Sequence, residues 1–426
     1  MSERRADSWY EATVRRDPPL PALEGDIQAD VCVVGAGLSG CSTALHLAQR
    51  GYKVVVLEAE RIGYAASGRS GGQIIPGWAG GMDKIAGQLG RSDARRVWDF
   101  SIEGIELTRE LIERNRIDCD LAWGHVHAAL KPRQRQELLD MQREQEGEFG
   151  YRKLRFMERE ETESWIASRR YVAGLYDAGA GHLHPLRYTL GVGRAAIAAG
   201  AQVFENSGVT GLSYGPTVTV KTARGSVRAK FVALCANVGH VDLSQRLARK
   251  LIGVASYVVA TQPLGEARAR ALLKGNIAVA DLNWIIDYYR LSADYRLLFG
   301  GRVSYSGIDP LGTTRATRQR MLNVFPQLAD VRIEYAWGGI IDITMSRLPN
   351  FGRLEPNVYY LQGFSGHGMV ATTIAGRLAA EAIAGQAERF DVMARIRHHD
   401  FPGGRLLRRP TLVMAMTWFR LRDLLP

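Results

Sequence analysis

Cysteine is scarce in this sequence, which has four in 426 residues. They are scattered without the spacing of a metal site, at Cys32, Cys41, Cys119 and Cys235. So few scattered thiols fit a reducing cytoplasm. His182 and His184 look like a metal-binding pair, but no third ligand lies nearby in the sequence. We therefore predict a structural role for both histidines and no metal site.

Long apolar segments are also missing. No uncharged apolar run reaches the ~18 residues that a membrane-spanning helix requires. Residues 1–29 are polar, and their arginines precede no apolar stretch of the signal-peptide type. We therefore expect a cytoplasmic protein without a membrane span.

Nucleic-acid motifs are absent too, although the formal net charge is +11. The arginines are spread along the chain, so we expect a solvated surface that attracts anions and no nucleic-acid partner. The exception is the C-terminal tail, 405–426, in which arginines surround two short apolar stretches. Such a basic amphipathic tail either docks on the protein's own surface, which we favour, or lies on an anionic membrane as a peripheral contact at its inner face.

Glycine is abundant, and three glycines define the clearest motif of the chain. An apolar run over 31–34 is followed by Gly35, Gly37 and Gly40, then by a helical stretch and a second apolar run that ends at Leu57. Gly35 permits a tight turn, Gly37 lets a pyrophosphate approach the backbone, and Gly40 lets helix and strand pack closely. This order predicts a strand–helix–strand unit that binds a dinucleotide at the start of the helix.

Two further features favour FAD as the dinucleotide. Glu58 ends the second strand, about 20 residues after the glycines, where a carboxylate accepts hydrogen bonds from a ribose 2′-hydroxyl; this favours FAD or NAD over NADP. A loop of small residues over 59–73 lets the backbone approach a bulky ring system, and it is longer than NAD dehydrogenases usually have. A second strand–glycine–helix pattern at 359–383 brings the other end of the chain to the same cofactor, so the cofactor is a long molecule.

These stretches resemble the FAD-dependent D-amino-acid-oxidase and sarcosine-oxidase-like family of amine oxidases. The segments that carry the resemblance run in order through nearly the whole chain, at 61–73, 181–185 (Gly-His-Leu-His-Pro), 287–300, 362–368 (Gln-Gly-Phe-Ser-Gly-His-Gly) and 401–405 (Phe-Pro-Gly-Gly-Arg). With the strand and helix patterns, the resemblance implies an α/β fold, α+β overall. In this fold, a Rossmann-like FAD-binding domain is interleaved with a substrate domain built on an antiparallel sheet.

The predicted domains are interleaved along the chain. We expect a discontinuous FAD-binding domain over 1–80, 150–245 and 340–404. The substrate-binding domain is expected over 81–149 and 246–339, and the tail over 405–426 follows as a separate segment. The stretch from about 250 to 345 alternates like β-strands, which is the basis for the antiparallel sheet.

The glycine motifs and the resemblance together predict the residues that hold FAD. In chain order they are Gly35, Ala36, Gly37, Leu38, Ser39, Gly40, Glu58, Ala59, Ser67, Gly68, Arg69, Ser70, Gly71, Gly72, Gln73, Val209, Ala236, Asn237, Arg347, Gly366, His367, Gly368 and Met369. Relatives often attach the flavin through a Cys late in the chain or a His in the early loop. Neither 345–349 nor 68–70 offers such a residue, so we expect non-covalent FAD.

A predicted strand over 284–291 carries the candidate substrate wall. Alternation places Trp284, Ile286, Tyr288 and Arg290 on one face, which would offer aromatic rings to an aliphatic amine and a cation to a distant carboxylate. The alternative is that the aromatic residues are ordinary core and that Arg290 is a surface charge. We predict Tyr288, His367 and Arg290 as catalytic residues and Trp284, Arg302 and Trp337 as substrate-binding residues.

The resemblance implies hydride transfer from an amine to flavin N5. Small α-amino-acid oxidases of this family often carry Arg-Pro where the present chain has Ile341-Asp342, so a simple amino acid is disfavoured. The resemblance implies a γ-glutamylated diamine such as γ-glutamylputrescine, oxidised to aldehyde, ammonia and hydrogen peroxide with O2 as acceptor. Two alternatives stay open. One is a membrane-associated dehydrogenase of a cyclic imino acid or other secondary amine that uses a quinone, and the other is a flavin-binding protein without turnover.

Overall fold

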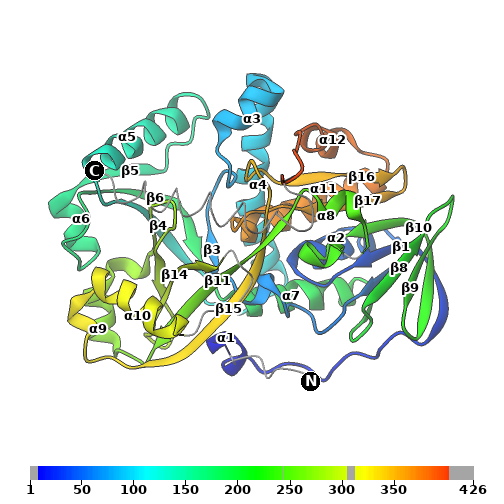
Figure 1. Ribbon diagram of the computed structural model, residues 1–426, viewed down its shortest axis with the longest axis horizontal. Helices are drawn as coiled ribbons and strands as arrows, with labels where there is room; N and C mark the ends of the chain where they lie inside the picture. The colour runs from blue at the N-terminus through cyan, green and yellow to red at the C-terminus, as the bar shows by residue number, and fades with distance from the viewer. Residues whose placement is uncertain (1–7, 242, 305–311, 403–426) are drawn as a thin grey trace.

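The computed structural model describes residues 8–241, 243–304 and 312–402. Within these residues the strands form two large sheets, which lie next to each other in Figure 1 with the first sheet on the right. The predicted tail over 405–426 lies outside the described residues. No helix in the described part of the chain is long and apolar enough to cross a membrane.

The first sheet contains the dinucleotide motif. Its eight described strands are β1 (Gly25–Val34), β2 (Val54–Leu57), β7 (Gln202–Phe204), β8 (Val209–Ser213), β9 (Val218–Thr222), β10 (Gly225–Leu234), β16 (Asn350–Glu355) and β17 (Val358–Gln362). β1 lies between β2 and β10 and is parallel to both. The apolar run 31–34 is buried because both faces of these central parallel strands are covered. β9 and β10 form an antiparallel hairpin.

Three helices position the carboxyl ends of these strands: α2 (Leu38–Ala48), α7 (Pro185–Ala198) and α11 (Gly368–Ile383). α2 is buried along its whole length because it packs against both α7 and α11. A Cβ atom on Gly376 of α11 would lie 2.5 Å from the Ser42 Cβ atom, so glycine permits the close crossing of the two helices. Ser42 Oγ also donates a hydrogen bond to the Thr373 carbonyl at 2.6 Å.

The second sheet is mainly antiparallel, as predicted for the substrate domain, with one parallel pairing between β4 and β12. Its nine described strands are β3 (Gln73–Ile74), β4 (Ala122–Ala129), β5 (Leu154–Glu158), β6 (Ala173–His182), β11 (Ile252–Thr261), β12 (Ala278–Asp281), β13 (Tyr288–Leu291), β14 (Leu297–Ser304) and β15 (Ile333–Ile343). β5 and β6 fall within 150–245, which we assigned to the FAD-binding domain. β6 pairs with β4, and β5 pairs with β6, so both strands belong to the second sheet.

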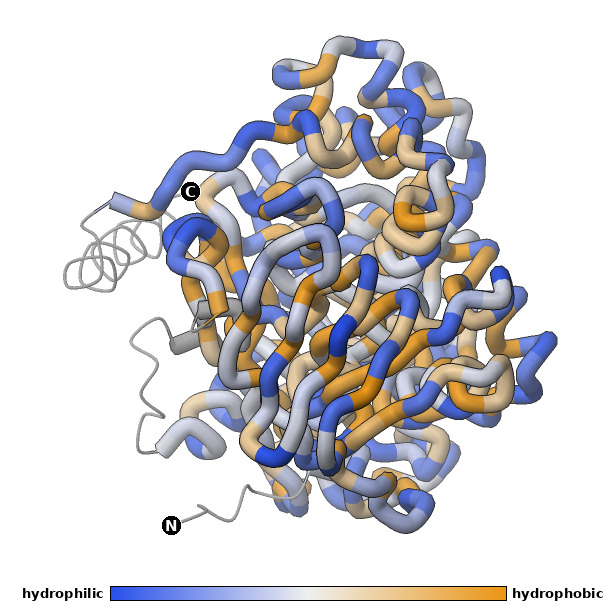
Figure 2. The backbone as a smooth tube through the Cα atoms, turned by 90° about the vertical axis from the view of Figure 1, so that its right-hand side faces the viewer, coloured by the Kyte–Doolittle hydropathy of each residue, from blue (hydrophilic) through white to orange (hydrophobic). Residues whose placement is uncertain are grey.

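The remaining helices flank the two sheets (Figure 1). They are α1 (Trp9–Ala12), α3 (Met82–Leu89), α4 (Arg91–Arg114), α5 (Pro132–Gly147), α6 (Arg159–Trp165), α8 (Gln245–Ala248), α9 (Glu266–Leu272), α10 (Thr313–Val324) and α12 (Glu388–Ala394), with short 3-10 turns η1 (Ala66–Gly68), η2 (Asn237–Val241), η3 (Lys274–Asn276) and η4 (Pro326–Leu328). α3 and α4 are separate helices, because Gly90 takes a positive φ of 82° between them. Figure 2 shows the orange hydrophobic segments mainly along the strands and the blue hydrophilic ones mainly at turns and outer loops.

The predicted strand over 284–291 is shorter than expected, since β13 begins only at Tyr288. The preceding residues are held in a turn by buried carboxylates. Asp281 accepts hydrogen bonds from the backbone amides of Asn283 (3.1 Å) and Asp287 (3.0 Å), and Asp287 accepts one from Arg320 Nε at 2.6 Å. These local bonds compete with strand pairing, so Trp284 does not share a strand face with Tyr288.

Candidate active site

The glycine turn after β1 has the geometry that a dinucleotide requires. Gly35 has a φ of +97°, and a Cβ atom on Gly40 would lie 1.9 Å from the Gly35 carbonyl oxygen. Gly37 is the N-cap of α2 and brings no side chain to the first turn. Ser67 Oγ accepts a hydrogen bond from Leu38 N at 2.9 Å, which holds the small-residue loop against this helix start. Backbone amides at a helix N-terminus bind phosphate well.

Glu58 closes the other side of this turn. Its carboxylate accepts hydrogen bonds from Ala36 N at 2.6 Å and from Glu60 N at 3.0 Å. Burial raises the pKa of Glu58, while these two backbone bonds lower it. Ser207 N donates to the Glu58 carbonyl at 2.7 Å, and Gly208 lies beside Ala59. Val209, one of the predicted FAD-binding residues, follows directly and starts β8.

The loop over 67–73 contacts the second sheet and α11. Arg69 Nε donates to the Gly338 carbonyl at 2.6 Å, and the Arg69 carbonyl accepts from Trp337 Nε1 at 3.1 Å. Ser70 Oγ lies 3.4 Å from Met369 Sδ at the start of α11. Gln73 Nε2 donates to the Val279 carbonyl at 3.1 Å. Predicted cofactor residues from both halves of the chain thus meet at the junction of the two sheets.

Tyr288 fills the space that two glycines leave open. A Cβ atom on Gly71 would lie 2.7 Å from Tyr288 Cε2, and one on Gly300 would lie 2.1 Å from Tyr288 Cζ. The Tyr288 hydroxyl lies 3.4 Å from Ser256 Oγ. Burial raises the pKa of Tyr288 to about 12, so the phenol is neutral near pH 7. β13 therefore presents this ring to the small-residue loop.

Arg290 has a different environment from the one predicted. Its side chain is 2% exposed and donates to three carbonyls, of Gly71 (2.8 Å), Leu291 (3.1 Å) and Leu183 (2.9 Å). Its Nη2 also donates to the Tyr10 hydroxyl at 3.1 Å. This guanidinium is therefore neither a surface charge nor a cation that faces a distant carboxylate. It ties the loop to α1 and to the end of β6, and its predicted role as a substrate-binding cation is not supported.

His367 stands at the N-cap of α11, between Gly366 and Gly368. Its Nε2 lies 3.1 Å from the Ile75 carbonyl, which assigns the proton to that nitrogen. Burial lowers the pKa of His367, so the imidazole is neutral near pH 7. The loop before it is held by Asp342, whose carboxylate accepts from Gly363 N at 2.5 Å. Burial raises the pKa of Asp342 to about 6.

The candidate substrate-binding residues are not all in one place. Trp337 is buried and donates to Arg69, and its ring meets Tyr10 edge-on at 5.1 Å between centroids. Trp284 is 40% exposed, and the Arg347 guanidinium carbon lies 5.8 Å from the centroid of its ring. Arg302 belongs to β14, but its side chain lies outside the described residues.

The segment 235–237 completes the contacts of the glycine turn. A Cβ atom on Gly35 would lie 2.9 Å from the Cys235 carbonyl oxygen and 3.1 Å from the Ala236 Cα atom. Asn237 has a φ of +54° and donates from Nδ2 to the Ile340 carbonyl at 3.3 Å. The end of β10 thus lies against the glycine turn.

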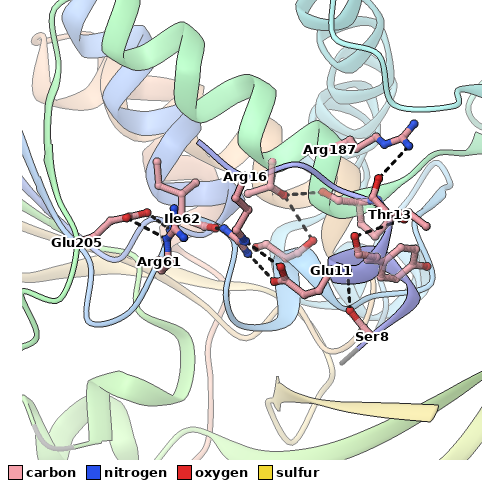
Figure 3. A network of polar contacts seen from close by, with 12 residues as sticks. Ser8, Glu11, Thr13, Arg16, Arg61, Ile62, Arg187 and Glu205 are labelled. Carbon is pink, nitrogen blue, oxygen red and sulfur yellow. Dashed lines mark hydrogen bonds and ion pairs between the residues drawn. The ribbon is translucent and has the colours of Figure 1, made fainter. Parts of the chain in front are cut away.

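The N-terminal segment is a part of the site that sequence reasoning missed. Figure 3 shows Glu11 paired with Arg16, whose Nη1 donates to the Ile62 carbonyl at 2.8 Å. Glu205 accepts hydrogen bonds from Ile62 N at 2.9 Å and from Arg61 Nε at 3.1 Å. These bonds fasten the segment to the loop after β2. Behind it, Tyr10 supports Arg290. The sequence signal was weak, because α1 is only four residues long.

The histidines on β4 and β6 form a buried group. The rings of His125 and His127 lie 4.5 Å apart between centroids, and burial lowers the pKa of both. His182 Nε2 lies 2.7 Å from the Asn276 carbonyl, whereas His184 Nε2 lies 3.2 Å from Thr13 Oγ1. The predicted pair therefore has separate structural partners. Among the described residues, no three His, Cys, Asp or Glu side chains are grouped as metal ligands.

The residues present fit FAD. The glycine turn leaves a helix start clear of side chains from its N-cap, and the Glu58 carboxylate stands beside it. The loop over 67–73 continues from this turn to Tyr288, Trp337 and Met369. This continuous path suits a molecule with an adenosine at one end and a large ring at the other.

Comparisons with known proteins agree with this geometry. A family model described as FAD dependent oxidoreductase matches residues 30–382. The chain is 42% identical over 417 residues to gamma-glutamylputrescine oxidoreductase of Escherichia coli (strain K12), and the aligned region covers 98% of each chain. It is 39% identical over 422 residues to the probable oxidoreductase OrdL of Haemophilus influenzae, covering 98% of this chain and 97% of that one. The crystal structure of glycine oxidase from Geobacillus kaustophilus superposes with a TM-score of 0.74 at 19% identity, covering 88% of this chain and 100% of that one.

Proposed function

Because this chain belongs to the family of FAD-dependent oxidoreductases, we propose that it oxidises a γ-glutamylated diamine, such as γ-glutamylputrescine, at the free primary amine. The predicted family, fold and dependence on FAD are confirmed. The observation that carries the substrate proposal is the 42% identity, over 98% of both chains, to an enzyme named for gamma-glutamylputrescine. The glycine oxidase likeness supports the fold alone, at 19% identity.

The position of Asp342 supports an amine without a nearby carboxylate. Small-amino-acid oxidases of the family often place an arginine at this point to hold the substrate carboxylate. Here Ile341 and a buried Asp342 stand there instead, and the Asp342 carboxylate is occupied by the amide of Gly363. An aspartate would repel a carboxylate at this position, so the reacting end of the substrate carries an amine on an unsubstituted carbon chain.

The proposed chemistry needs little from the protein beyond placement. FAD, when bound, accepts a hydride at N5 from the carbon next to nitrogen. Tyr288 provides an uncharged aromatic surface at the loop, and His367 is a neutral imidazole at the start of α11. Overall, one amine, one O2 and one water give one aldehyde, one ammonia and one hydrogen peroxide.

Anaerobic stopped-flow bleaching of the flavin tests the substrate. We expect γ-glutamylputrescine to bleach it faster than putrescine, sarcosine, pipecolate or D-alanine. The rate with γ-glutamylputrescine should rise with pH, because the amine must lose its proton before hydride transfer. A faster reaction with pipecolate or D-alanine would refute the substrate proposal and leave the family assignment intact.

The electron acceptor needs its own measurement. We propose O2, so re-oxidation of the bleached flavin by air-saturated buffer should be fast and should release one hydrogen peroxide per aldehyde. Slow re-oxidation in air together with fast re-oxidation by a soluble quinone would identify a dehydrogenase. Absence of bleaching with every amine would support a flavin-binding protein without turnover.

A further inference from the structure

We propose that Arg347 and Trp284 bind the anionic end of the substrate at the outer rim of the site. This inference rests on the proposed function, because it names the residues that distinguish a γ-glutamylated diamine from the free diamine. The group recognised is the α-carboxylate of the glutamyl head. Arg347 was predicted to contact the cofactor, and Trp284 was predicted on a strand face that it does not occupy.

The two side chains come from different connections and meet at the surface. Trp284 lies between β12 and β13, and Arg347 lies between β15 and β16. The Arg347 guanidinium carbon is 5.8 Å from the Trp284 ring centroid, within the range of a cation–π contact. Trp284 is 40% exposed, and Met345 beside Arg347 is 49% exposed. An exposed indole beside a guanidinium offers an apolar face and a positive charge to the same ligand.

The rim is close to the reacting centre. The strand end that leads to Arg347 lies against the loop before α11, because Thr344 N donates to Ser365 Oγ at 3.4 Å and Ser365 N donates to the Asp342 carbonyl at 3.0 Å. The segment that carries Arg347 also packs against Gly80, because a Cβ atom on Gly80 would lie 2.9 Å from the Ser346 carbonyl oxygen. Arg347 therefore links a segment that is fastened to the loop before His367 with the exposed indole of Trp284.

Backbone strain at Arg347 agrees with a binding role. Its φ is +65°, in the left-handed region that residues other than glycine seldom adopt. Such conformations have an energetic cost and cluster at ligand-binding positions, where the surrounding structure enforces them. Arg347 N donates to the Thr344 carbonyl at 3.1 Å, so a tight turn holds this conformation and aims the side chain.

The other arginine predicted for this task is already committed. Arg290 is buried and donates to three carbonyls and to Tyr10. A guanidinium binds a carboxylate through two parallel N–H bonds, and stacking on an indole fixes the plane of that fork. The glutamyl carbon chain would pack on the exposed face of Trp284, while the diamine chain extends inward toward Tyr288.

Binding of an unreactive ligand tests the inference without turnover. The probe is γ-glutamyl-n-butylamide, which keeps the glutamyl head and lacks the reacting amine. By titration calorimetry on the FAD-loaded protein, Arg347→Gln should weaken this ligand about 5–30-fold. Arg347→Lys should weaken it less, because it keeps the charge. The affinity for N-butylacetamide, which keeps the amide and the butyl chain but has no head group, should stay within twofold in both variants. Arg143→Gln, an exposed arginine on α5, is the matched control and should change neither affinity.

Kinetics give a second readout. In Arg347→Gln, the KM for γ-glutamylputrescine should rise by a similar factor while its kcat and the KM for putrescine stay near the wild-type values. Trp284→Leu should give a smaller change of the same kind. Equal weakening of both ligands, or an unchanged affinity for γ-glutamyl-n-butylamide, would overturn the inference. Loss of FAD from Arg347→Gln would overturn it as well, in favour of the cofactor contact. If the wild type does not oxidise γ-glutamylputrescine, the proposed function itself fails.

Discussion

The Glu58 carboxylate accepts a hydrogen bond from the backbone amide of Ala36 at 2.6 Å, so the acid that ends β2 also fastens the turn that ends β1. One side chain therefore serves two strands. It fixes the conformation of the glycine turn, and it stands where an adenosine ribose would lie. Substitution of Glu58 is expected to affect the protein with and without its cofactor.

We predict that Glu58→Ala weakens FAD binding by about 2–4 kcal/mol, because charge-assisted bonds to the ribose are lost and water recovers only part of them. The measurement is the FAD dissociation constant from flavin fluorescence on reconstitution of the apoprotein. Glu60→Ala is the control, since Glu60 is exposed and contributes only its backbone amide to Glu58. Unchanged FAD affinity in Glu58→Ala would leave Glu58 a structural residue alone.

We predict that the FAD is non-covalent. The described cysteines are all buried, and burial raises the pKa of each thiol, so none is a reactive thiolate. Acid precipitation should release all of the flavin as intact FAD into the supernatant. Yellow fluorescence that stays with the denatured polypeptide on a gel would contradict this expectation.

Arg290→Met should destabilise the protein by about 2–4 kcal/mol, because the buried carbonyls of Gly71 and Leu183 lose their donor. Urea unfolding of the FAD-loaded protein measures the loss. If Arg290 is structural, the ratio of KM values for putrescine and γ-glutamylputrescine should not change in the surviving folded enzyme. A changed ratio at unchanged stability would restore the substrate-binding role for Arg290.

Gly300→Ala should displace the Tyr288 ring. The new Cβ atom would lie 2.1 Å from Tyr288 Cζ, and overpacking of this kind costs about 1–3 kcal/mol. Thermal unfolding and the flavin absorption spectrum should both change, because the same ring lies against Gly71 of the cofactor loop. Gly87→Ala on α3 is the matched control. No atom lies within 4 Å of its new Cβ, so the exchange should be neutral or stabilising. Equal thermal stability and equal flavin spectra in the two variants would show that the Tyr288 ring moves aside without a loss of stability.

His182 should make the protein sensitive to acid. It is 1% exposed, and burial, then the charge of Arg290, lowers its pKa to about 3, while its Nε2 bond to the Asn276 carbonyl opposes the shift. Its stabilising contribution is complete above the unfolded pKa near 6.5. That contribution falls as pH drops from 6.5 towards 3, because the unfolded state alone takes up the proton. At pH 5 the loss is about 2 kcal/mol.

The measurement is urea unfolding at pH 7.5 and pH 5 for the wild type and His182→Gln. The variant should lose less stability between the two pH values, although His127 and His184 keep part of the dependence. An identical slope in the two proteins would mean that His182 is protonated in the native state at pH 5.

The sequence predicted the cofactor side of the molecule well because its signals are local. The glycine spacing and the apolar runs specify β1, α2 and β2 without reference to distant residues. The environment of Arg290 was not predictable in this way. It depends on Tyr10 and Leu183, which lie 280 and 107 positions away in the chain. The early end of β13 was missed for a similar reason, since Arg320 on α10 helps to hold Asp287 in a turn.

The pairing of β1 with β10 also has a consequence for how the chain folds. Gly25 pairs with Gly225 and Val34 with Leu234, so each contact in this ladder spans 200 residues. α2 then packs on α11, more than 300 residues later. During synthesis, β1 cannot pair with β10 until β10 has been made. Until then, this edge of β1 stays unpaired and its apolar residues are exposed. We expect the yield of the expressed protein to depend on chaperones that shield this edge. An N-terminal fragment that ends before β10 should aggregate.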